Sequence, residues 1–124
     1  MDPKVMIVDD DDELHTLYGL YLRGASYQII EAYNGQEALS LLAQGKPDLI
    51  VLDMIMPVMD GETFLRKLHV IEGLNRIPVI IASVNEKIAP EFLGYENVKT
   101  VLRKPFTIQA LSETIQKNLP NFFE

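Results

Sequence analysis

Short apolar runs alternate with longer amphipathic stretches along the whole chain. The runs are rich in branched apolar residues, which is typical of strands that are covered on both faces. Buried strands that alternate with helices predict an α/β fold with a parallel sheet between two helical layers. Right-handed crossovers then make it a doubly wound sheet. The predicted strands are Val5 to Val8, Tyr27 to Ala32, Leu49 to Leu52, Pro78 to Ala82 and Val98 to Leu102.

The amphipathic stretches predict helices at about residues 14–22, 38–42, 64–71 and 108–115. The acids Asp11, Asp12 and Glu13 precede the first of them, where carboxylates favour a helix N-terminus. The third helix is expected to end near Gly73. Residues 85–96 are interrupted by Pro90, which would cost about 3 kcal/mol in a helix interior but suits the first position of a short helix.

The size and composition of the chain indicate a single domain and exclude several kinds of protein. The 124 residues predict one domain, 1–124, because a domain has roughly 150 residues. The net charge of −7 argues against non-specific nucleic-acid binding, which needs clustered cations. The absence of Cys excludes disulfides and thiolate metal sites. The apolar runs are too short to span a membrane and the first residues do not resemble a secretory signal, so we expect a cytoplasmic protein.

Polar side chains stand at the ends of the predicted strands. Asp9 and Asp10 follow the first strand, and Asp53 follows the third. Ser83 ends the fourth strand, and Lys104 comes just after the fifth. In a doubly wound sheet the ligand site lies beyond the carboxyl ends of the strands. We therefore expect these five side chains to converge at one edge of the sheet.

This set of side chains indicates phosphoryl chemistry. Three adjacent carboxylates raise one another's pKa unless cations offset their charge. Mg²⁺ binds carboxylate oxygens at phosphoryl-transfer sites, and Lys104 supplies a second cation. A carboxylate that remains free can be a nucleophile that forms an aspartyl phosphate. Mg²⁺, Lys104 and the Ser83 hydroxyl would then stabilise the charge on the phosphoryl oxygens.

Four segments at these strand ends carry a resemblance to a known family: Val5 to Asp10, Leu52 to Gly61, Ile80 to Ser83 and Lys104 to Phe106. Together they resemble the receiver domain of two-component response regulators, in order and along the whole chain. The resemblance implies a flavodoxin-like sheet with strand order 2-1-3-4-5. It also implies Mg²⁺-dependent transfer of a phosphoryl group from a phosphohistidine, on a sensor histidine kinase or a phosphotransfer protein, to Asp53.

The resemblance assigns the metal site. Asp53 is expected to be both the phosphoacceptor and a Mg²⁺ ligand. Asp10 is expected to bind the metal directly and Asp9 largely through water. The backbone carbonyl of Ile55 completes the expected ligands. Such a domain is not an enzyme in the usual sense, because its catalysis is limited to the phosphorylation and dephosphorylation of its own aspartate.

The resemblance also assigns the contacts of the phosphoryl group. Ser83 is expected to be the switch hydroxyl and Lys104 the phosphate-binding lysine, with a cis bond to Pro105.

Three features differ from the family. Pro90 interrupts the segment in which the family normally has a regular fourth helix. Val101 stands where the family usually has an aromatic switch ring, and Val84 stands where it usually has Ala. These differences concern the output of the signal and leave the chemistry unchanged.

Two other functions stay open at this point. A receiver fold could act only as a partner-binding module, without phosphorylation. A small phosphatase of the haloacid dehalogenase type would use Asp9 as nucleophile and Asp11 as acid/base, but it leaves Asp53 unexplained. The two histidines, His15 and His69, have no partner at metal-ligand spacing, so we interpret them as surface or core residues.

Overall fold

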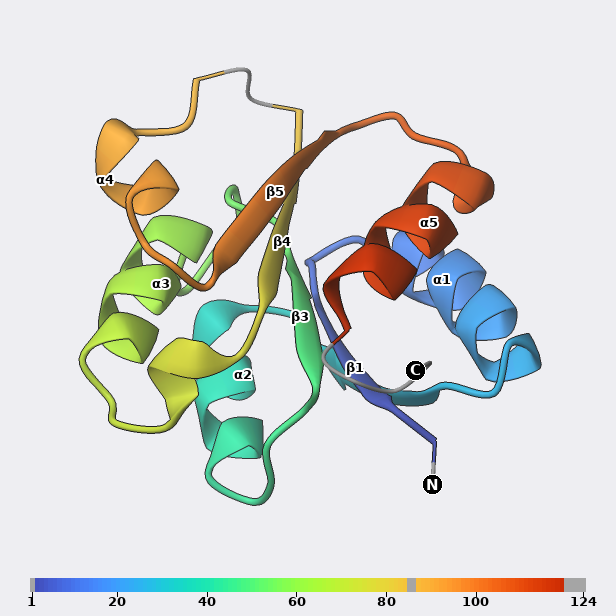
Figure 1. Ribbon diagram of the computed structural model, residues 1–124, viewed down its shortest axis with the longest axis horizontal. Helices are drawn as coiled ribbons and strands as arrows, with labels where there is room; N and C mark the ends of the chain where they lie inside the picture. The colour runs from blue at the N-terminus through green and yellow to red at the C-terminus, as the bar shows by residue number, and fades with distance from the viewer. Residues whose placement is uncertain (1, 85–86, 120–124) are drawn as a thin grey trace.

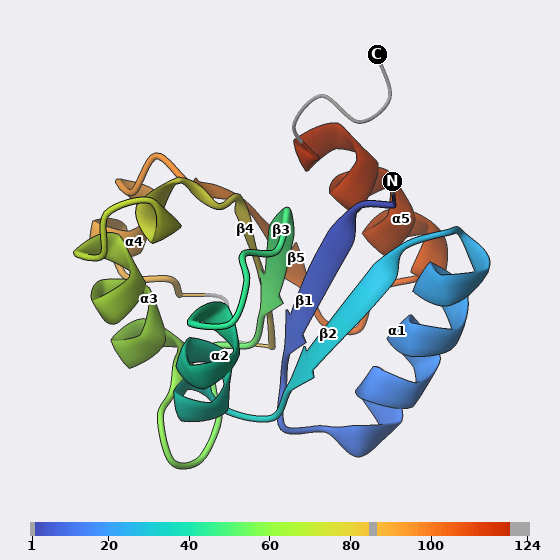
Figure 2. The same ribbon diagram turned by 90° about the horizontal axis from the view of Figure 1, so that it is seen from below.

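The structure, a computed structural model, describes residues 2–84 and 87–119. Its centre is a five-stranded sheet in the order β2-β1-β3-β4-β5, with every neighbouring pair parallel. Figure 2 shows the twisted sheet with helices on both sides. The predicted doubly wound fold and strand order are therefore confirmed. The strands are β1 (Lys4–Val8), β2 (Gln28–Ala32), β3 (Leu49–Leu52), β4 (Val79–Ser83) and β5 (Val98–Arg103).

The helices form two layers. One layer contains α1 (Asp12–Gly24) and α5 (Ile108–Asn118), which lie side by side on one face of the sheet (Figures 1 and 2). The other face is covered by α2 (Gly35–Leu42), α3 (Gly61–His69) and α4 (Pro90–Leu93). Within the described residues, no helix has the length and apolar character needed to cross a membrane.

The strands bury side chains on both faces, which explains their continuous apolar runs. In β1, Met6 and Val8 pack against the layer of α2 and α3, whereas Val5 and Ile7 pack against the layer of α1 and α5. The same alternation divides the buried residues of β3 and β4 between the two cores. The inner strands β1, β3 and β4 thus bury apolar side chains on both faces, and the polar side chains of the site stand at the ends of these strands.

The helices α1, α2, α3 and α5 begin where the sequence supplies a capping side chain. Asp11 caps α1, and its Oδ1 accepts hydrogen bonds from the amides of Glu13 and Leu14. Side-chain oxygens cap three further helices in the same way, because they satisfy amides that have no partner within the helix. These caps are Asn34 for α2, Asp60 for α3 and Thr107 for α5.

The segment after α3 differs from the prediction. The helix ends at His69, whereas the apolar spacing had extended it to Ile71. The amide of Ile71 donates to the carbonyl of Leu68, three residues back, so the chain has already left the α-helical pattern. Gly73 then adopts a φ of 88°, which favours glycine, and leads into the short 3₁₀ helix η1 (Leu74–Arg76).

The fourth crossover contains only a short helix. Pro90 occupies the first position of α4, as the sequence allowed, and the helix ends at Leu93. Arg66 of α3 binds the short helix α4, because its Nε and Nη2 donate hydrogen bonds to the carboxylate of Glu91 at 3.1 and 3.0 Å. The Arg66 guanidinium also lies 5.0 Å from the centre of the Phe92 ring. Side-chain contacts of Arg66 with Glu91 and Phe92 therefore hold α4 to α3.

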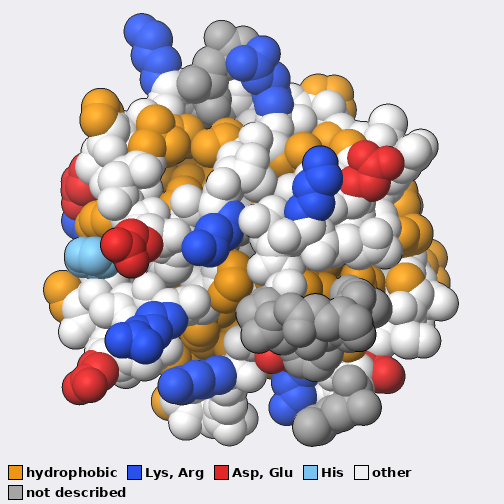
Figure 3. Space-filling model, viewed as in Figure 1, with side chains coloured by type: hydrophobic (Ala, Val, Ile, Leu, Met, Phe, Trp, Pro, Cys, Tyr) orange, Lys and Arg blue, Asp and Glu red, His pale blue; other side chains and the backbone are white. Residues whose placement is uncertain are grey.

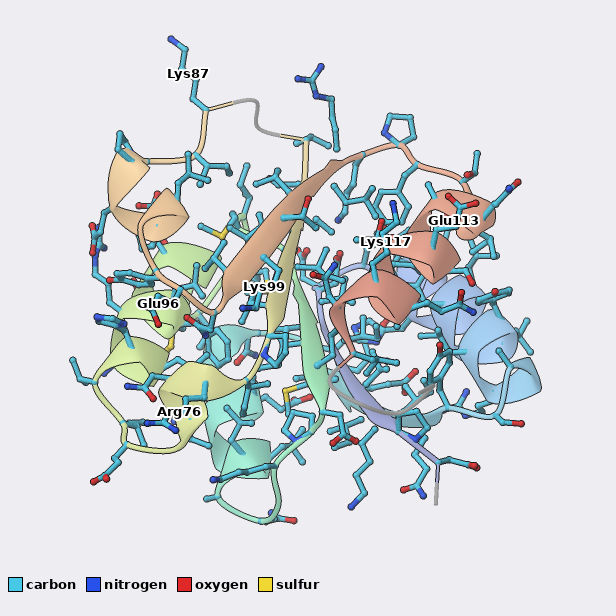
Figure 4. All side chains as sticks on the ribbon, in the orientation of Figure 1. Arg76, Lys87, Glu96, Lys99, Glu113 and Lys117 are labelled. Atoms are coloured by element: carbon cyan, nitrogen blue, oxygen red, sulfur yellow. The ribbon has the colours of Figure 1, made fainter. Side chains whose placement is uncertain are left out.

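Strand β5 forms one edge of the sheet. Its residues alternate between half-buried and exposed, and Lys99 and Val101 are among the exposed ones. A lysine on an edge strand disfavours pairing with a strand of another molecule. On the face of the molecule that Figure 3 shows, the Lys and Arg side chains lie apart from one another, with Asp and Glu side chains among them. Figure 4 shows the labelled side chains pointing to solvent: Arg76, Lys87, Glu96, Lys99, Glu113 and Lys117.

Candidate functional site

The predicted site residues meet at the carboxyl edge of the sheet. Asp9 and Asp10 follow β1, and Asp53 follows β3, the strand that pairs with β1. Asp9 and Asp53 are buried, whereas Asp10 is exposed. One ligand atom from each of the three carboxylates lies within 4.8 Å of the others. The structure thus brings together the three acids that the sequence singled out.

This donor set suits a hard divalent cation. All three groups offer carboxylate oxygens, the ligands that Mg²⁺ prefers, and one of them faces solvent, from which the waters of a magnesium ion would come. Ile55 lies in the loop two residues after Asp53, and its amide donates to Asp53 Oδ1 at 3.3 Å. The ligand role of the Ile55 carbonyl stays a prediction.

Lys104 lies between the two buried acids. Its Nζ donates to Asp9 Oδ2 at 2.6 Å and lies 3.7 Å from Asp53 Oδ2. The backbone fixes this lysine, because its amide donates to the carbonyl of Ser83 at 3.1 Å. The following bond, to Pro105, is cis, as the resemblance implied. The side chain therefore places a cation beside both carboxylates.

Ser83 ends β4 and is fully buried. In the pairing of β3 with β4, Leu52 lies opposite Ile81. Ser83 comes two residues after Ile81, so it lies beside the loop that begins with Asp53. This register brings the hydroxyl to the same edge as the carboxylates. Its contact with a phosphoryl group stays a prediction.

Asp53 has an environment that opposes its negative charge. Burial raises the pKa of its carboxyl above the usual value of 3.8, and the carboxylates of Asp9 and Asp10 raise that pKa further. The Lys104 ammonium and the amide of Ile55 lower it, but the net shift is upward. A divalent cation bound to these acids would offset the same repulsion.

This raised pKa predicts how stability depends on pH. Because the native Asp53 carboxylate is disfavoured above its pKa, Asp53→Asn is expected to raise the free energy of unfolding at neutral pH, by about 0.5–2 kcal/mol without metal. The gain should shrink as the pH falls through the raised pKa of the native carboxyl and should vanish below 3.8, where the carboxyl is protonated in both the folded and the unfolded state. Urea unfolding of both proteins across this pH range measures it. An equal gain at every pH would contradict the electrostatic cause.

Asp11 and His15 lie near the site, and the sequence indicated the role of Asp11 but not the contact of His15. Asp11 caps α1, as the acidic run suggested, so its carboxylate is engaged away from the metal cluster. His15 was interpreted as a surface or core residue, and it is buried. Its Nε2 lies 2.7 Å from the carbonyl oxygen of Asp9, a contact that no pattern in the sequence indicated.

Comparisons with known proteins agree with this geometry. Residues 5–116 match the family described as the response regulator receiver domain. Sporulation initiation phosphotransferase F of Bacillus subtilis (strain 168) is 32% identical over 120 residues, which cover 97% of this chain and 96% of that protein. Response regulator GtcR of Aneurinibacillus migulanus is 33% identical over 125 residues, but this chain spans only 50% of its length.

A solved structure supports the same assignment. The chemotaxis response regulator CheY4 of Vibrio cholerae is similar with a TM-score of 0.87 and 26% sequence identity, and the match covers 96% of this chain and 100% of that one. The fold, the strand order and the acidic edge thus agree with a family match over most of the chain. This chain belongs to the response regulator receiver domain family of two-component signalling.

Proposed function

We propose that this chain is a receiver domain, spanning 1–124, that accepts a phosphoryl group on Asp53. The observation that carries the proposal is the convergence of Asp9, Asp10 and Asp53 within 4.8 Å, with the Lys104 ammonium against Asp9. The donor is a phosphohistidine of a sensor histidine kinase or a phosphotransfer protein in the cytoplasm. A receiver of this kind acts on its own aspartate and on no other substrate.

In the transfer, an oxygen of the Asp53 carboxylate attacks phosphorus. The new O–P bond forms as the P–N bond to the histidine breaks, and the histidine nitrogen leaves with the electron pair. Lys104 stabilises the charge on the phosphoryl oxygens, because its Nζ already lies 3.7 Å from Asp53 Oδ2. Ser83 donates its hydroxyl to another of these oxygens.

Asp9, Asp10, Asp53 and the backbone carbonyl of Ile55 would hold Mg²⁺. A bound Mg²⁺ supplies positive charge that orients and stabilises the transferring phosphoryl group. Asp10 is exposed and offers a direct ligand at the solvent side. Asp9 is buried and shared with Lys104, which suits a contact that passes largely through water.

The phosphorylated state would then bias a two-state equilibrium. In this chain the residue at the usual aromatic switch position is Val101, which is 38% exposed. Because a valine has no ring to rotate, the change is carried by Ser83 and the loops at the sheet edge. The short α4, tied to α3 through Arg66 and Glu91, is the neighbouring element on which such a change acts.

Intact mass after incubation with acetyl phosphate tests the proposal. We expect the wild-type protein to gain a single phosphoryl group when Mg²⁺ is present. With a chelator in place of Mg²⁺, the added mass is expected to disappear, because the carboxylate cluster alone repels the anionic donor. If no adduct forms under any condition although Mg²⁺ binds, the chain is instead a receiver fold that acts only by binding partners.

A further inference from the structure

The imidazole of His15 lies beneath the acidic cluster. The residue is 2% exposed and projects from α1 towards the end of β1. Its Nε2 lies 2.7 Å from the carbonyl oxygen of Asp9. Because a carbonyl oxygen can only accept a hydrogen bond, Nε2 carries the hydrogen and donates it.

The remaining contacts of the ring hold it in this orientation. It stacks on Tyr33, with the two ring centres 4.1 Å apart and the planes at 28°. Its other nitrogen, Nδ1, has no hydrogen-bond partner among the described residues. The nearest acidic atom to Nδ1 is Glu31 Oε1 at 3.8 Å, beyond hydrogen-bond distance. The bond to Asp9 is thus the one hydrogen bond that the ring makes in the described structure.

Asp9 is held at each of its polar atoms. Its amide donates to the carbonyl of Ala32 at 3.1 Å, and its Oδ1 accepts from the amide of Asp11 at 3.0 Å. Its Oδ2 accepts from Lys104, and its carbonyl oxygen accepts from His15. Without the imidazole, the carbonyl of this buried residue would lack a described donor. Its peptide plane would then turn to find one, because an unsatisfied buried acceptor is unfavourable.

We propose that His15 is a positioning residue for the metal site, with Tyr33 as the surface that holds its ring. The carbonyl that His15 fixes and the carboxylate expected to hold Mg²⁺ belong to the same residue, Asp9. Fixing the Asp9 backbone therefore fixes the direction of its carboxylate. The inference rests on the proposed Mg²⁺ site and adds a residue that does not touch the ion.

Calorimetric titration of the unphosphorylated protein with Mg²⁺ tests this role. His15→Phe keeps a flat ring against Tyr33 but removes the donor, and we expect it to weaken Mg²⁺ binding about tenfold. His15→Gln retains an N–H donor and is expected to recover most of the affinity. The matched control is His69→Phe, since His69 of α3 also stacks on a tyrosine, Tyr95, with ring centres 3.9 Å apart. Among the described residues its hydrogen bonds and ring contacts involve Asn75 and Tyr95, which are not residues of the site.

Each outcome decides the proposal. A loss in His15→Phe, recovered by His15→Gln and absent from His69→Phe, supports it, because a general loss of stability would not be specific to the donor. Equal affinity of wild type and His15→Phe overturns it and leaves the proposed function intact. Absence of saturable Mg²⁺ binding by the wild type overturns both the metal site and the positioning role.

A measurement on the wild type keeps the test independent of how the variants fold. In an NMR titration, saturating Mg²⁺ is expected to shift the Nε2–H resonance of His15 and to leave the ring of His69 unchanged. Ring resonances of His15 that stay in place at saturating Mg²⁺ would overturn the coupling between this imidazole and the metal site.

Discussion

Asp53→Asn is expected to take up no phosphoryl group from acetyl phosphate at any Mg²⁺ concentration, whereas the wild-type protein takes up one. An amide has no anionic oxygen that can attack phosphorus, so the O–P bond does not form. The substitution keeps the size of the side chain and removes a charge that burial and two neighbouring carboxylates oppose. The folded site should therefore persist, and intact mass should report the loss of chemistry alone.

The matched control for this variant is Asp12→Asn. Asp12 is an exposed acid in the first turn of α1, outside the metal cluster. We expect the Asp12→Asn variant to take up the phosphoryl group to the same extent as the wild-type protein. If the phosphoryl adduct still formed in Asp53→Asn but not in Asp9→Asn, the nucleophile would be Asp9 and not Asp53. That result would favour the phosphatase interpretation over the receiver function.

Gly61→Ala is expected to destabilise the fold by about 1–3 kcal/mol, although alanine normally favours a helix. A Cβ at this first residue of α3 would lie 2.6 Å from the backbone oxygen of Asp53 and 2.6 Å from the Cα of Met54. Both atoms belong to the backbone of the loop that carries the phosphoacceptor. The clash is relieved by a movement of this loop or of the first turn of α3 that packs on it, so the rate of phosphoryl uptake should fall as well.

Gly24→Ala provides the comparison, because a Cβ at the end of α1 would meet no described atom within 4 Å apart from its chain neighbours and the backbone of its own helix. We expect it to be neutral or slightly stabilising, since alanine loses less backbone freedom on folding. Urea unfolding of both variants measures the difference. If Gly61→Ala were as stable as Gly24→Ala, the close approach of α3 to the Asp53 loop would not exist in solution.

The fold was predictable because of how its strands are buried. A strand such as β3, Leu49–Leu52, is apolar at every position, and only a sheet covered on both faces accommodates that pattern. The site was predictable for a related reason. Because β1 and β3 bury apolar side chains on both faces, Asp9 and Asp53 stand at the strand ends, and the parallel pairing of these strands brings those ends together.

Contacts between loops were not predictable from spacing. The place of Lys104 between Asp9 and Asp53 depends on the path of the chain after β5. The stack of His15 on Tyr33 joins α1 to the loop after β2 and leaves no periodic pattern in the sequence. The end of α3 at His69 likewise depends on backbone turns, which the apolar spacing alone does not encode.

Chemical trapping of the phosphorylated residue tests the central claim most directly. Borohydride reduces an aspartyl phosphate to homoserine, so peptide sequencing by mass spectrometry identifies the aspartate that carried the phosphoryl group. We expect homoserine at position 53 alone, and only in protein that was treated with acetyl phosphate and Mg²⁺. Homoserine at position 9 or 10, or none in protein that gained the mass, would contradict the assignment of Asp53 as phosphoacceptor.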